Sequence, residues 1–419
     1  MNIGNGSEEH PENVDLARLG VTMPFEDREQ DSPRIYRFPA TAAKFVISIL
    51  LLCAGLLAPR GYAQQDEWSG VQRIVAIGDI HGDYEQFITL LRDSGLIDRR
   101  NRWSGGKAHL VQLGDVPDRG SDTRNVLELL MKLEKEAARA GGMVHALIGN
   151  HEAMNIYGDL RYVSPEDFAS YRDRNSVKTR EYFYQQEIEN ARISAPEGEM
   201  PEFDDQHRRD WEARHPLGYF EQRFAFSERG IYGQWIREHN AVIKVNDTLF
   251  LHGGISPQYA ASSVREINQQ IRSELADFRK LQGGMVIDET GPLWYRGLAL
   301  DDETMLMPHV DQVLQHLGVR RIVVGHTVTQ GTVIPRFDGK VLLADAGMSA
   351  LYGSRRACLI LDNDGAWVLH RGKKLSIPTD SGQAFVEYLK KVAALDPQPS
   401  PLEMLLHQIE DTVLTPTVP

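Results

Sequence analysis

Five short polar motifs recur along the chain, and four of them directly follow a short apolar run. They are residues 78–82 (GDIHG), 114–120 (GDVPDRG), 149–152 (GNHE), 252–254 (HGG) and 325–327 (GHT). Their carboxylate, imidazole and amide groups are ligands that suit manganese, iron or zinc. Asp79 and His81 are two residues apart, so on extended backbone both side chains point to the same side, and the two oxygens of Asp115 allow it to bridge two ions. The pattern predicts a site for two metal ions with the ligands Asp79, His81, Asp115, Asn150, His252 and His326.

The apolar runs before these motifs are rich in β-branched residues, which predicts short buried strands. The predicted strands cover residues 71–77, 108–113, 143–148 and 321–324. Open α/β folds place their sites at such strand ends, so the motif residues should gather at one edge of a sheet. Apolar residues at helical spacing predict helices over residues 84–94 and 126–137, and glycines at 141–142 end the second helix. The β-α-β-α-β order is typical of a layered α/β domain.

The second half of the chain is richer in predicted hairpins, because Asp-Gly and Asn-Asp pairs interrupt alternating apolar runs there. The predicted hairpins cover residues 241–251, 332–343 and 357–369, and predicted helices cover residues 264–281 and 308–317. These elements predict two packed sheets with helices outside. Residues 155–235 are rich in aromatic and charged residues, and we predict a mostly helical insertion over the site. Residues 396–419 carry several prolines and are predicted to form a tail.

The composition is that of a soluble globular protein, with 42% hydrophobic and 25% charged residues among 419. These fractions exclude a multi-span membrane protein and a wholly disordered chain. The formal net charge of −13 argues against sequence-independent binding of nucleic acid, so no nucleic-acid partner is expected. With only two cysteines, Cys53 and Cys358, the chain cannot form a disulfide framework or a cysteine-rich zinc module.

Residues 1–63 are predicted to be a leader, because residues 45–58 form one continuous apolar run directly after a lysine. This run is shorter than the about 20 residues of an ordinary membrane-spanning helix. Small residues at Gly61 and Ala63 are spaced like a signal-peptidase site, which predicts cleavage after Ala63 and a periplasmic or secreted protein. Two alternatives are an uncleaved anchor, in which residues 45–58 hold the protein in a membrane, and a buried core helix.

The motifs, taken in order, resemble those of the calcineurin-like metallophosphoesterases. Residues 118–120 (DRG) and 252–257 (HGGISP) are similar to the phosphoprotein phosphatase branch of that superfamily. Further segments look most like its bacterial-type members, the Shewanella-like protein phosphatases: residues 149–155 (GNHEAMN), 158–162 (GDLRY), 292–297 (PLWYRG) and 345–349 (DAGMS). The resemblance covers residues 71–369. It implies an α/β fold, a four-layer α/β/β/α sandwich, in a metallophosphoesterase domain over residues 66–395.

The resemblance also implies the chemistry, in which a metal-bridging hydroxide attacks the phosphorus of a phosphate ester. Two cations about 3.5–4 Å apart would bind the ester oxygens and lower the pKa of a shared water. The first ion would be held by Asp79, His81 and Asp115, and the second by Asp115, Asn150, His252 and His326. Divalent or trivalent ions of manganese, iron or zinc fit this ligand set, and the sequence does not choose among them.

Four further residues have expected roles beside the metals. His151 follows the ligand Asn150 and would protonate the leaving oxygen. Asp118 would orient the His151 imidazole and keep it protonated. Arg119 and Arg296 would clamp the remaining phosphate oxygens with their forked guanidinium groups. The family assigns these roles to its matching residues.

The substrate class has one leading interpretation and two alternatives. The leading one is a protein phosphatase, and the family's plant relatives favour phosphotyrosine. The Ser-Ala-Pro-Asn-Tyr motif of eukaryotic serine/threonine enzymes is absent from the sequence, and residues 345–349 stand in its region. One alternative is hydrolysis of small phosphoesters such as nucleotides or dinucleoside polyphosphates, and the other is a non-catalytic binding protein on the same fold. A membrane is an expected partner only through an uncleaved anchor.

Overall fold

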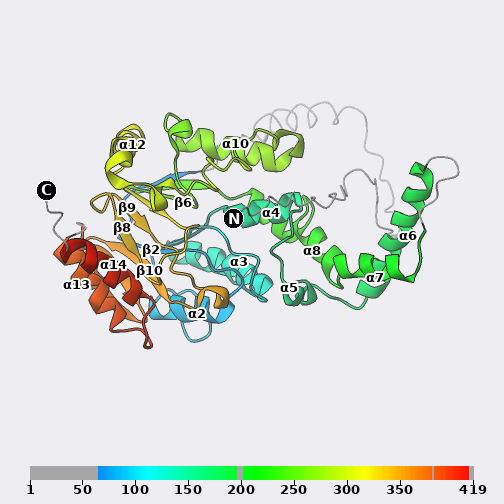
Figure 1. Ribbon diagram of the computed structural model, residues 1–419, viewed down its shortest axis with the longest axis horizontal. Helices are drawn as coiled ribbons and strands as arrows, with labels where there is room; N and C mark the ends of the chain where they lie inside the picture. Colours follow the sequence, from blue (N-terminus) through cyan, green and yellow to red (C-terminus); the bar gives the residue numbers. More distant parts are fainter. Residues whose placement is uncertain (1–64, 196–201, 380–381, 415–419) are drawn as a thin grey trace, which may run out of the picture. The chain divides into compact units, whose positions relative to one another are not determined.

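Two sheets of six strands each lie at the centre of the described part of the chain, whose structure is a computed structural model (Figure 1). The first sheet has the spatial order β12-β11-β10-β2-β3-β4, with β2 Arg73–Ile77, β3 His109–Gln112, β4 Met143–Ala146, β10 Ala357–Asp362, β11 Gly365–His370 and β12 Lys373–Ser376. The second has the order β1-β5-β6-β7-β9-β8, with β1 Glu67–Trp68, β5 Val242–Val245, β6 Thr248–Leu251, β7 Arg321–Val324, β8 Ile334–Arg336 and β9 Val341–Leu343.

The structure describes residues 65–195, 202–379 and 382–414. The chain divides into two units, residues 1–65 and 66–419, and all elements named here belong to the second. The predicted leader, with its apolar run at residues 45–58 and its cleavage site after Ala63, lies outside the described residues. No helix within the described ranges is both long and apolar enough to span a membrane.

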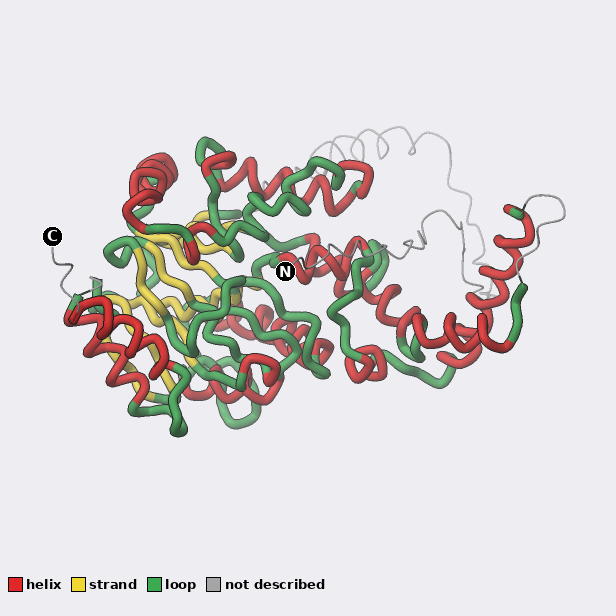
Figure 2. Tube along the Cα trace, in the orientation of Figure 1, coloured by secondary structure: helices red, strands yellow, loops and turns green. Residues whose placement is uncertain are grey.

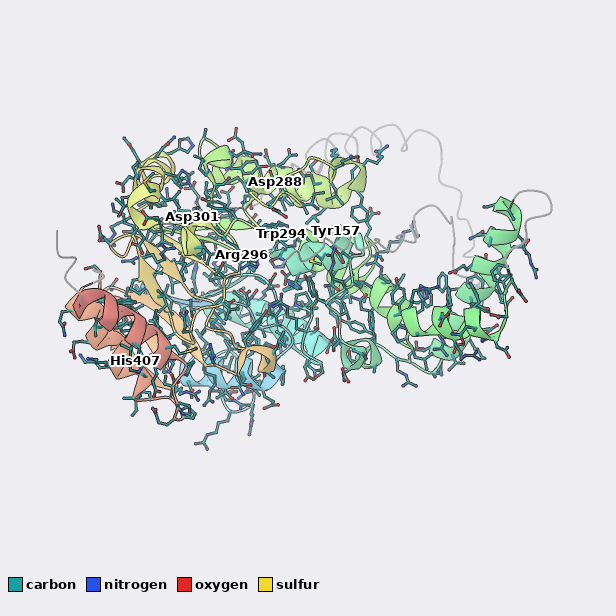
Figure 3. All side chains as sticks on the ribbon, viewed as in Figure 1. Tyr157, Asp288, Trp294, Arg296, Asp301 and His407 are labelled. Carbon is teal, nitrogen blue, oxygen red and sulfur yellow. The ribbon has the colours of Figure 1, made fainter. Side chains whose placement is uncertain are left out.

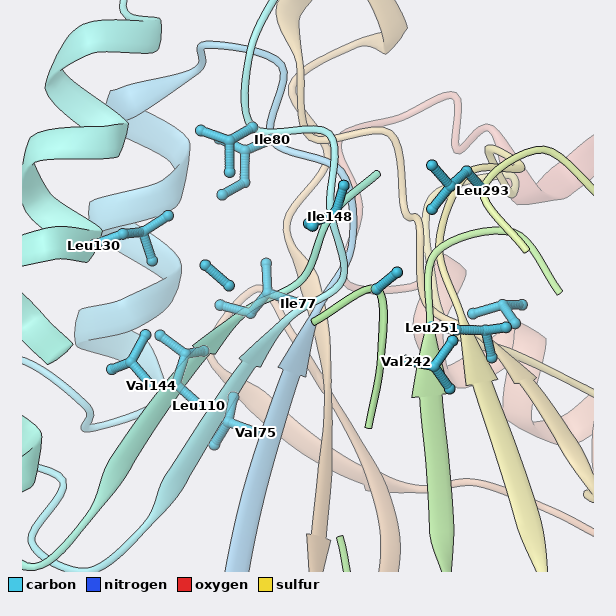
Figure 4. Close-up of a cluster of buried hydrophobic side chains, with 14 of the residues drawn as sticks. Val75, Ile77, Ile80, Leu110, Leu130, Val144, Ile148, Val242, Leu251 and Leu293 are labelled. Carbon is cyan, nitrogen blue, oxygen red and sulfur yellow. The ribbon is translucent and has the colours of Figure 1, made fainter. Parts of the chain in front are cut away.

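The core forms because side chains alternate across strands that are buried on both faces. In β2, Ile74 and Ala76 belong to a cluster shared with Phe250 of the second sheet, and this cluster fills the space between the sheets. Val75 and Ile77 point the other way, toward the helices, as Figure 4 shows. A strand buried on both faces needs a continuous apolar run, which is the pattern of the sequence here.

Helices cover the outer faces of both sheets, so that the strands lie between helical layers in Figure 2. The helices outside the insertion are α2 Tyr84–Asp93, α3 Thr123–Ala140, α4 Asn150–Tyr157, α10 Val264–Ala276, α11 Gly297–Leu300, α12 Glu303–Leu317, α13 Gln383–Ala393 and α14 Leu402–Leu414. Apolar residues of α2 and α3 pack on the first sheet, and those of α10 and α12 pack on the second. The predicted four-layer α/β/β/α sandwich is confirmed.

Most predicted elements are present, and one predicted helix begins earlier than expected. Helix α12 begins at Glu303 rather than at Pro308, because the side chain of Asp302 caps it by accepting a hydrogen bond from the amide of Met305. Pro308 therefore lies inside the helix. The predicted hairpin at residues 357–369 is β10 and β11, and β10 joins it to the first sheet by pairing with β2.

The helical insertion runs from Pro165 to Arg237 and contains α5 Pro165–Ser170, α6 Ser176–Ser194, α7 Asp205–Arg214, α8 Tyr219–Phe226 and α9 Ile231–Arg237. It has a small aromatic core of its own, built on Tyr184, Ile188 and Trp211. Asn155, where the predicted insertion begins, belongs to α4. The predicted tail contains α14, which packs against α13 and buries Leu402 fully, because its leucines fall on one face.

Candidate metal centre

The motif residues meet because parallel strands of both sheets end at the same place. In the first sheet β2, β3 and β4 are parallel, with Ile77 paired to Gln112 and Gln112 to Ala146. In the second sheet β6 and β7 are parallel, with Leu251 paired to Val324. The segments after these strands, with Asn150 at the start of α4, carry the six residues that the sequence predicts as metal ligands, and the structure brings all six together: Asp79, His81, Asp115, Asn150, His252 and His326.

Asp115 lies at the centre of this group. Its Oδ2 lies 3.2 Å from His252 Nε2 and 3.8 Å from His81 Nε2, two imidazoles predicted to bind different ions. Its Oδ1 accepts a hydrogen bond of 2.9 Å from the amide of His151, which fixes the carboxylate plane. Asp115 therefore stands between the two predicted ion positions, as a bridging ligand must.

Each of the three histidines predicted as a ligand is held in one tautomer by a backbone carbonyl. Nδ1 of His81 lies 3.0 Å from the Pro117 carbonyl oxygen, and Nδ1 of His252 lies 2.9 Å from that of Leu113. Nε2 of His326 lies 3.0 Å from the Trp294 carbonyl oxygen. Because a carbonyl only accepts, the proton must sit on the nitrogen that faces it. The other nitrogen of each ring is then free of a proton and points into the centre, which is how metal-binding histidines are oriented.

These unprotonated nitrogens converge with other acceptors, and this is the strongest test of metal binding that the geometry offers. His252 Nε2 lies 2.9 Å from Asn150 Oδ1 and 3.1 Å from His326 Nδ1. The Asn150 amide nitrogen faces Met154 Sδ at 3.9 Å, so its oxygen is the atom turned inward. When both rings are neutral, these three atoms are all acceptors and repel each other, and a cation between them removes the repulsion. The donor set therefore fits a bound metal ion.

The electrostatics of the centre agree with this interpretation. Burial, together with Asp345 and Asp115, raises the pKa of Asp79 well above its usual value. Burial alone would raise the pKa of Asp115, but His252 and His151 hold it well below its usual range. Burial lowers the pKa of His81 to about 3, so its imidazole is neutral and able to bind a metal. Closely spaced carboxylates that resist ionising together are typical of a site built for added positive charge.

The backbone of the site is strained at five positions that are not glycine. Positive φ angles occur at His81 (48°), Asp115 (58°), Asp118 (74°), Arg119 (67°) and His326 (63°). The left-handed conformation costs about 1–2 kcal/mol for such residues. Strain of this kind clusters at functional sites, where it aims side chains that a relaxed strand or helix would point elsewhere.

His151 and Asp118 form a buried dyad beside the metal ligands. His151 Nδ1 lies 2.5 Å from Asp118 Oδ2, and both side chains are almost fully buried. Burial lowers the pKa of His151, but the carboxylates of Asp115 and Asp118 outweigh it and raise the pKa above its ordinary value. Arg119 Nη2 lies 3.1 Å from the other ring nitrogen, Nε2. The imidazole therefore presents Nε2 to the same space as the Arg119 guanidinium, which is predicted to bind phosphate.

A cavity of about 250 Å³ opens over the centre and contains both predicted phosphate-binding arginines. The Arg119 guanidinium lies over two tyrosine rings, 5.4 Å from the centre of Tyr162 and 5.2 Å from that of Tyr352. Such contacts hold a cation without neutralising it. Arg296 donates to the His326 carbonyl at 2.8 Å, and Figure 3 shows it beside Trp294, whose ring also lines the cavity.

Several residues that contribute to the site were not predicted from the sequence. Glu152 accepts hydrogen bonds from the amides of Asp115, Val116 and Gly149 at 2.7–2.8 Å, and so ties two ligand loops together. Burial and the neighbouring Asp115 raise the pKa of Glu152 to about 7. Its position three residues after Gly149, at the start of a helix, is the capping-box signal that would have indicated it. Tyr162 and Tyr352 have no comparable local signal.

All ten predicted site residues thus lie in one place, while their individual roles stay predictions. Six converge as candidate ligands, His151 and Asp118 form the dyad, and Arg119 and Arg296 line the cavity above them. Two buried groups that share Asp115 are spaced to hold a metal ion: Asp115, His252 and His326 match the predicted second ion. The other group joins His81 and Asp115 with His151, the predicted proton donor, and Asp79 Oδ2 lies 3.8 Å from His81 Nε2 beside it. Such paired clusters of histidine and aspartate are typical of binuclear phosphoesterases.

Comparison with known proteins finds one matching family, related sequences and a similar solved structure. Residues 72–330 match the Calcineurin-like phosphoesterase family. An uncharacterised protein of Schizosaccharomyces pombe is 33% identical over 314 residues, covering 72% of this chain and 81% of the relative. Shewanella-like protein phosphatase 2 of Arabidopsis thaliana is 30% identical over 349 residues, covering 77% and 84% of the two chains. The crystal structure of a cold-active protein-tyrosine phosphatase from a psychrophilic Shewanella species is similar, with a TM-score of 0.58, 28% identity and coverage of 76% and 84%.

Proposed function

This chain belongs to the calcineurin-like phosphoesterases and is a metal-dependent phosphoesterase, and from that premise we propose that it removes phosphate from tyrosine side chains of proteins. The observation that carries the proposal is the cavity over the metal centre. It combines two arginines with the aromatic rings of Tyr162, Trp294 and Tyr352. Arginines suit the phosphate and rings suit an aryl group, so one cavity matches both ends of a phosphotyrosine side chain.

The residues of the chain divide the reaction between binding and proton transfer. Two bound cations would neutralise charge on the ester and supply a hydroxide nucleophile from a shared water. Arg119 and Arg296 hold the phosphate oxygens that the cations leave free. As the new bond to phosphorus forms, the bond to the ester oxygen breaks, and that oxygen takes the proton from Nε2 of His151. Asp118 keeps the ring oriented and stabilises its positive charge until the proton has left.

The size of the cavity favours a side chain over a larger nucleotide. Its volume of about 250 Å³ is below the range of about 300–1,000 Å³ that is usual for pockets enclosing a drug-sized ligand. A dinucleoside polyphosphate would extend far outside it. The relative named as a protein-tyrosine phosphatase adds support for the tyrosine class, at 28% identity.

A competition panel tests the proposal. Protein stripped of metal and reloaded with manganese is given a phosphotyrosine peptide, a phosphoserine peptide of the same sequence, and ATP. We expect the phosphotyrosine peptide to have the highest kcat/KM, and a His316→Ala variant, which removes an exposed histidine of α12, to show the same order. Equal turnover of all three substrates would refute the tyrosine assignment, and preference for ATP would favour the nucleotide alternative. Elemental analysis of protein as isolated would identify the metals among manganese, iron and zinc.

We also propose that the protein is exported to the periplasm or secreted. The support is the apolar run at residues 45–58 and the small residues at Gly61 and Ala63. Amino-terminal sequencing of protein recovered from the producing cells should begin at Gln64. Full-length protein recovered in the membrane fraction would favour the uncleaved anchor instead.

A further inference from the structure

Helix α8 of the insertion lies against α4, the helix that carries Asn150 and His151. Two successive residues of α8 make the contact. The side chain of Gln222 donates to Asn155 Oδ1 at 2.6 Å, and Arg223 donates to the backbone carbonyl of Asn155 at 2.7 Å. The carbonyls at the end of a helix carry partial negative charge, so a guanidinium is well placed there.

The contact through Gln222 continues to the catalytic dyad as an unbroken chain of hydrogen bonds. Nδ2 of Asn155 donates to Asp118 Oδ1 at 2.8 Å, and also to the carbonyl of His151 at 2.9 Å. The other oxygen of Asp118 meets His151 Nδ1 at 2.5 Å. Gln222, Asn155 and Asp118 are completely buried, so no solvent competes for these bonds. A residue of the insertion is therefore three hydrogen bonds from the ring that faces the phosphate.

In this series of hydrogen bonds, the chemistry of each side chain decides which group donates and which accepts. An ionised Asp118 only accepts, so Asn155 must turn its amide nitrogen toward it. The oxygen of Asn155 then faces α8 and needs a donor, because an unpaired buried acceptor costs about 1–3 kcal/mol. The Gln222 nitrogen is that donor.

Gln222 satisfies the buried oxygen of Asn155 while leaving its own oxygen unpaired. Its own Oε1 is buried and has no hydrogen-bond partner among the described residues. An apolar side chain of similar shape would remove this unpaired oxygen but would leave Asn155 Oδ1 without its donor. Natural proteins retain such local conflicts mainly at functional sites.

From these contacts we propose that Gln222 is a positioning residue for the His151–Asp118 dyad, so that the helical insertion helps to aim the proton donor at the leaving oxygen. This inference rests on the proposed phosphatase function, in which His151 gives up the proton. Gln222 touches no reacting atom and acts through Asn155 and Asp118.

The opposite side of α8 explains how the insertion holds Gln222 in place. Phe220 stacks on Phe183 of α6, with ring centres 4.1 Å apart, and lies beside Trp211 of α7. A Cβ added to Gly158, directly after α4, would lie 2.8 Å from Arg223 Nη2, so the two helices meet closely there. Helix α8 thus joins the aromatic core of the insertion to the dyad.

The test separates proton donation from general damage by varying the leaving group. Gln222→Met keeps the shape and removes the donor, while Phe224→Ala changes an exposed residue of the same helix and serves as the control. The substrates are phenyl phosphate, whose leaving group needs a proton, and p-nitrophenyl phosphate, whose leaving group is a much weaker base. We expect Gln222→Met to lower kcat for phenyl phosphate about three- to tenfold and for p-nitrophenyl phosphate much less. Metal content and the control variant should be unchanged.

A double-mutant cycle gives a second readout that a merely structural role would not produce. If Gln222 acts through Asn155, then Gln222→Met should have no further effect on kcat in an Asn155→Ala background. Gln222→Ala is made in parallel, so that the result does not depend on one variant folding well.

The outcomes are distinct. Equal slowing of both substrates, additive losses in the cycle, or no change in Gln222→Met would overturn the inference and leave the phosphatase function standing. Wild-type protein that hydrolyses neither aryl phosphate would overturn the proposed function and the inference with it.

Discussion

Removing the bound metals should lower the free energy of unfolding by about 5 kcal/mol. The reason is the convergence of acceptors at His252 Nε2, which lies 2.9 Å from Asn150 Oδ1 and 3.1 Å from His326 Nδ1, so that neutral rings leave these lone pairs facing each other. The carboxylates of Asp79 and Asp115 add negative charge to the same buried space. An ion that binds only the folded state stabilises it by about 2.7 kcal/mol when its concentration is 100 times its dissociation constant, and two ions give about twice that.

The number of residues in the unit sets its unfolding entropy, and this entropy relates the free energy of metal binding to a shift in melting temperature. The unfolding entropy is about 2.1 cal/mol/K per residue, so that of the unit over residues 66–419 is about 0.7 kcal/mol/K. The shift in melting temperature is the change in unfolding free energy divided by this entropy. The two ions should raise the melting temperature by about 7 °C. Differential scanning calorimetry of chelated and manganese-loaded protein measures the shift.

Matched histidine variants make the assay specific. His252→Ala removes a predicted ligand of the second ion, so the metal-dependent shift should fall to about half. His316→Ala removes an exposed histidine from α12 and should leave the shift intact. A chelated protein that melts within 1 °C of the loaded one would refute the reasoning, because the converging acceptors would then need no cation.

Three further predictions test the dyad, the core and the C-terminal region. His151→Ala should slow hydrolysis of phenyl phosphate by about 10²–10⁴-fold with both metals retained, as steady-state kinetics and elemental analysis would show; loss of a metal would instead identify His151 as a ligand. Phe250→Ala, in the core between the sheets, should cost about 3–5 kcal/mol in urea unfolding, and a loss under 1 kcal/mol would contradict the packing described. Burial would raise the pKa of Asp396, but hydrogen bonds from Arg371 and His370 lower it. A lowered carboxyl pKa stabilises the fold above the unfolded value of about 3.9, so Asp396→Asn should be destabilised at neutral pH and approach wild type as the pH falls below about 4. A constant difference in urea unfolding across that range would count against the ion pair.

The strands, and the place where the candidate ligands gather, were predictable for the same physical reason. A strand buried on both faces, such as β2 (Arg73–Ile77), must be apolar throughout, and the chain can place polar groups only after it ends. The ligands Asp79 and His81 stand at that point. An apolar run followed by polar residues therefore predicts both the strand and the position of the site, even when the pairing of the strands is not known.

Tertiary contacts explain what the sequence did not predict. Gln222 meets Asn155 from 67 positions away along the chain, and nothing local to either residue marks the pair. Tyr162 and Tyr352 come to the same guanidinium from distant loops. The sequence predicts α12 only from residue 308, whereas the cap at Asp302 makes the helix begin at Glu303.

Because the backbone of the site is strained and its ligand groups repel each other, the site depends on the packed core behind it. Five residues with positive φ, at about 1–2 kcal/mol each, together cost of the order of the whole stability of a typical domain. Such a site can be held only by structure that is stable without it, and the core between the sheets, with Phe250 fully buried, lies directly behind the strand ends that carry the ligands. The packing of the core holds the repelling ligand groups close together before any metal binds. A bound cation relieves this repulsion, so tighter packing of the core should increase the affinity for the ions. A core variant such as Phe250→Ala should therefore bind manganese more weakly than wild type, although it changes no ligand.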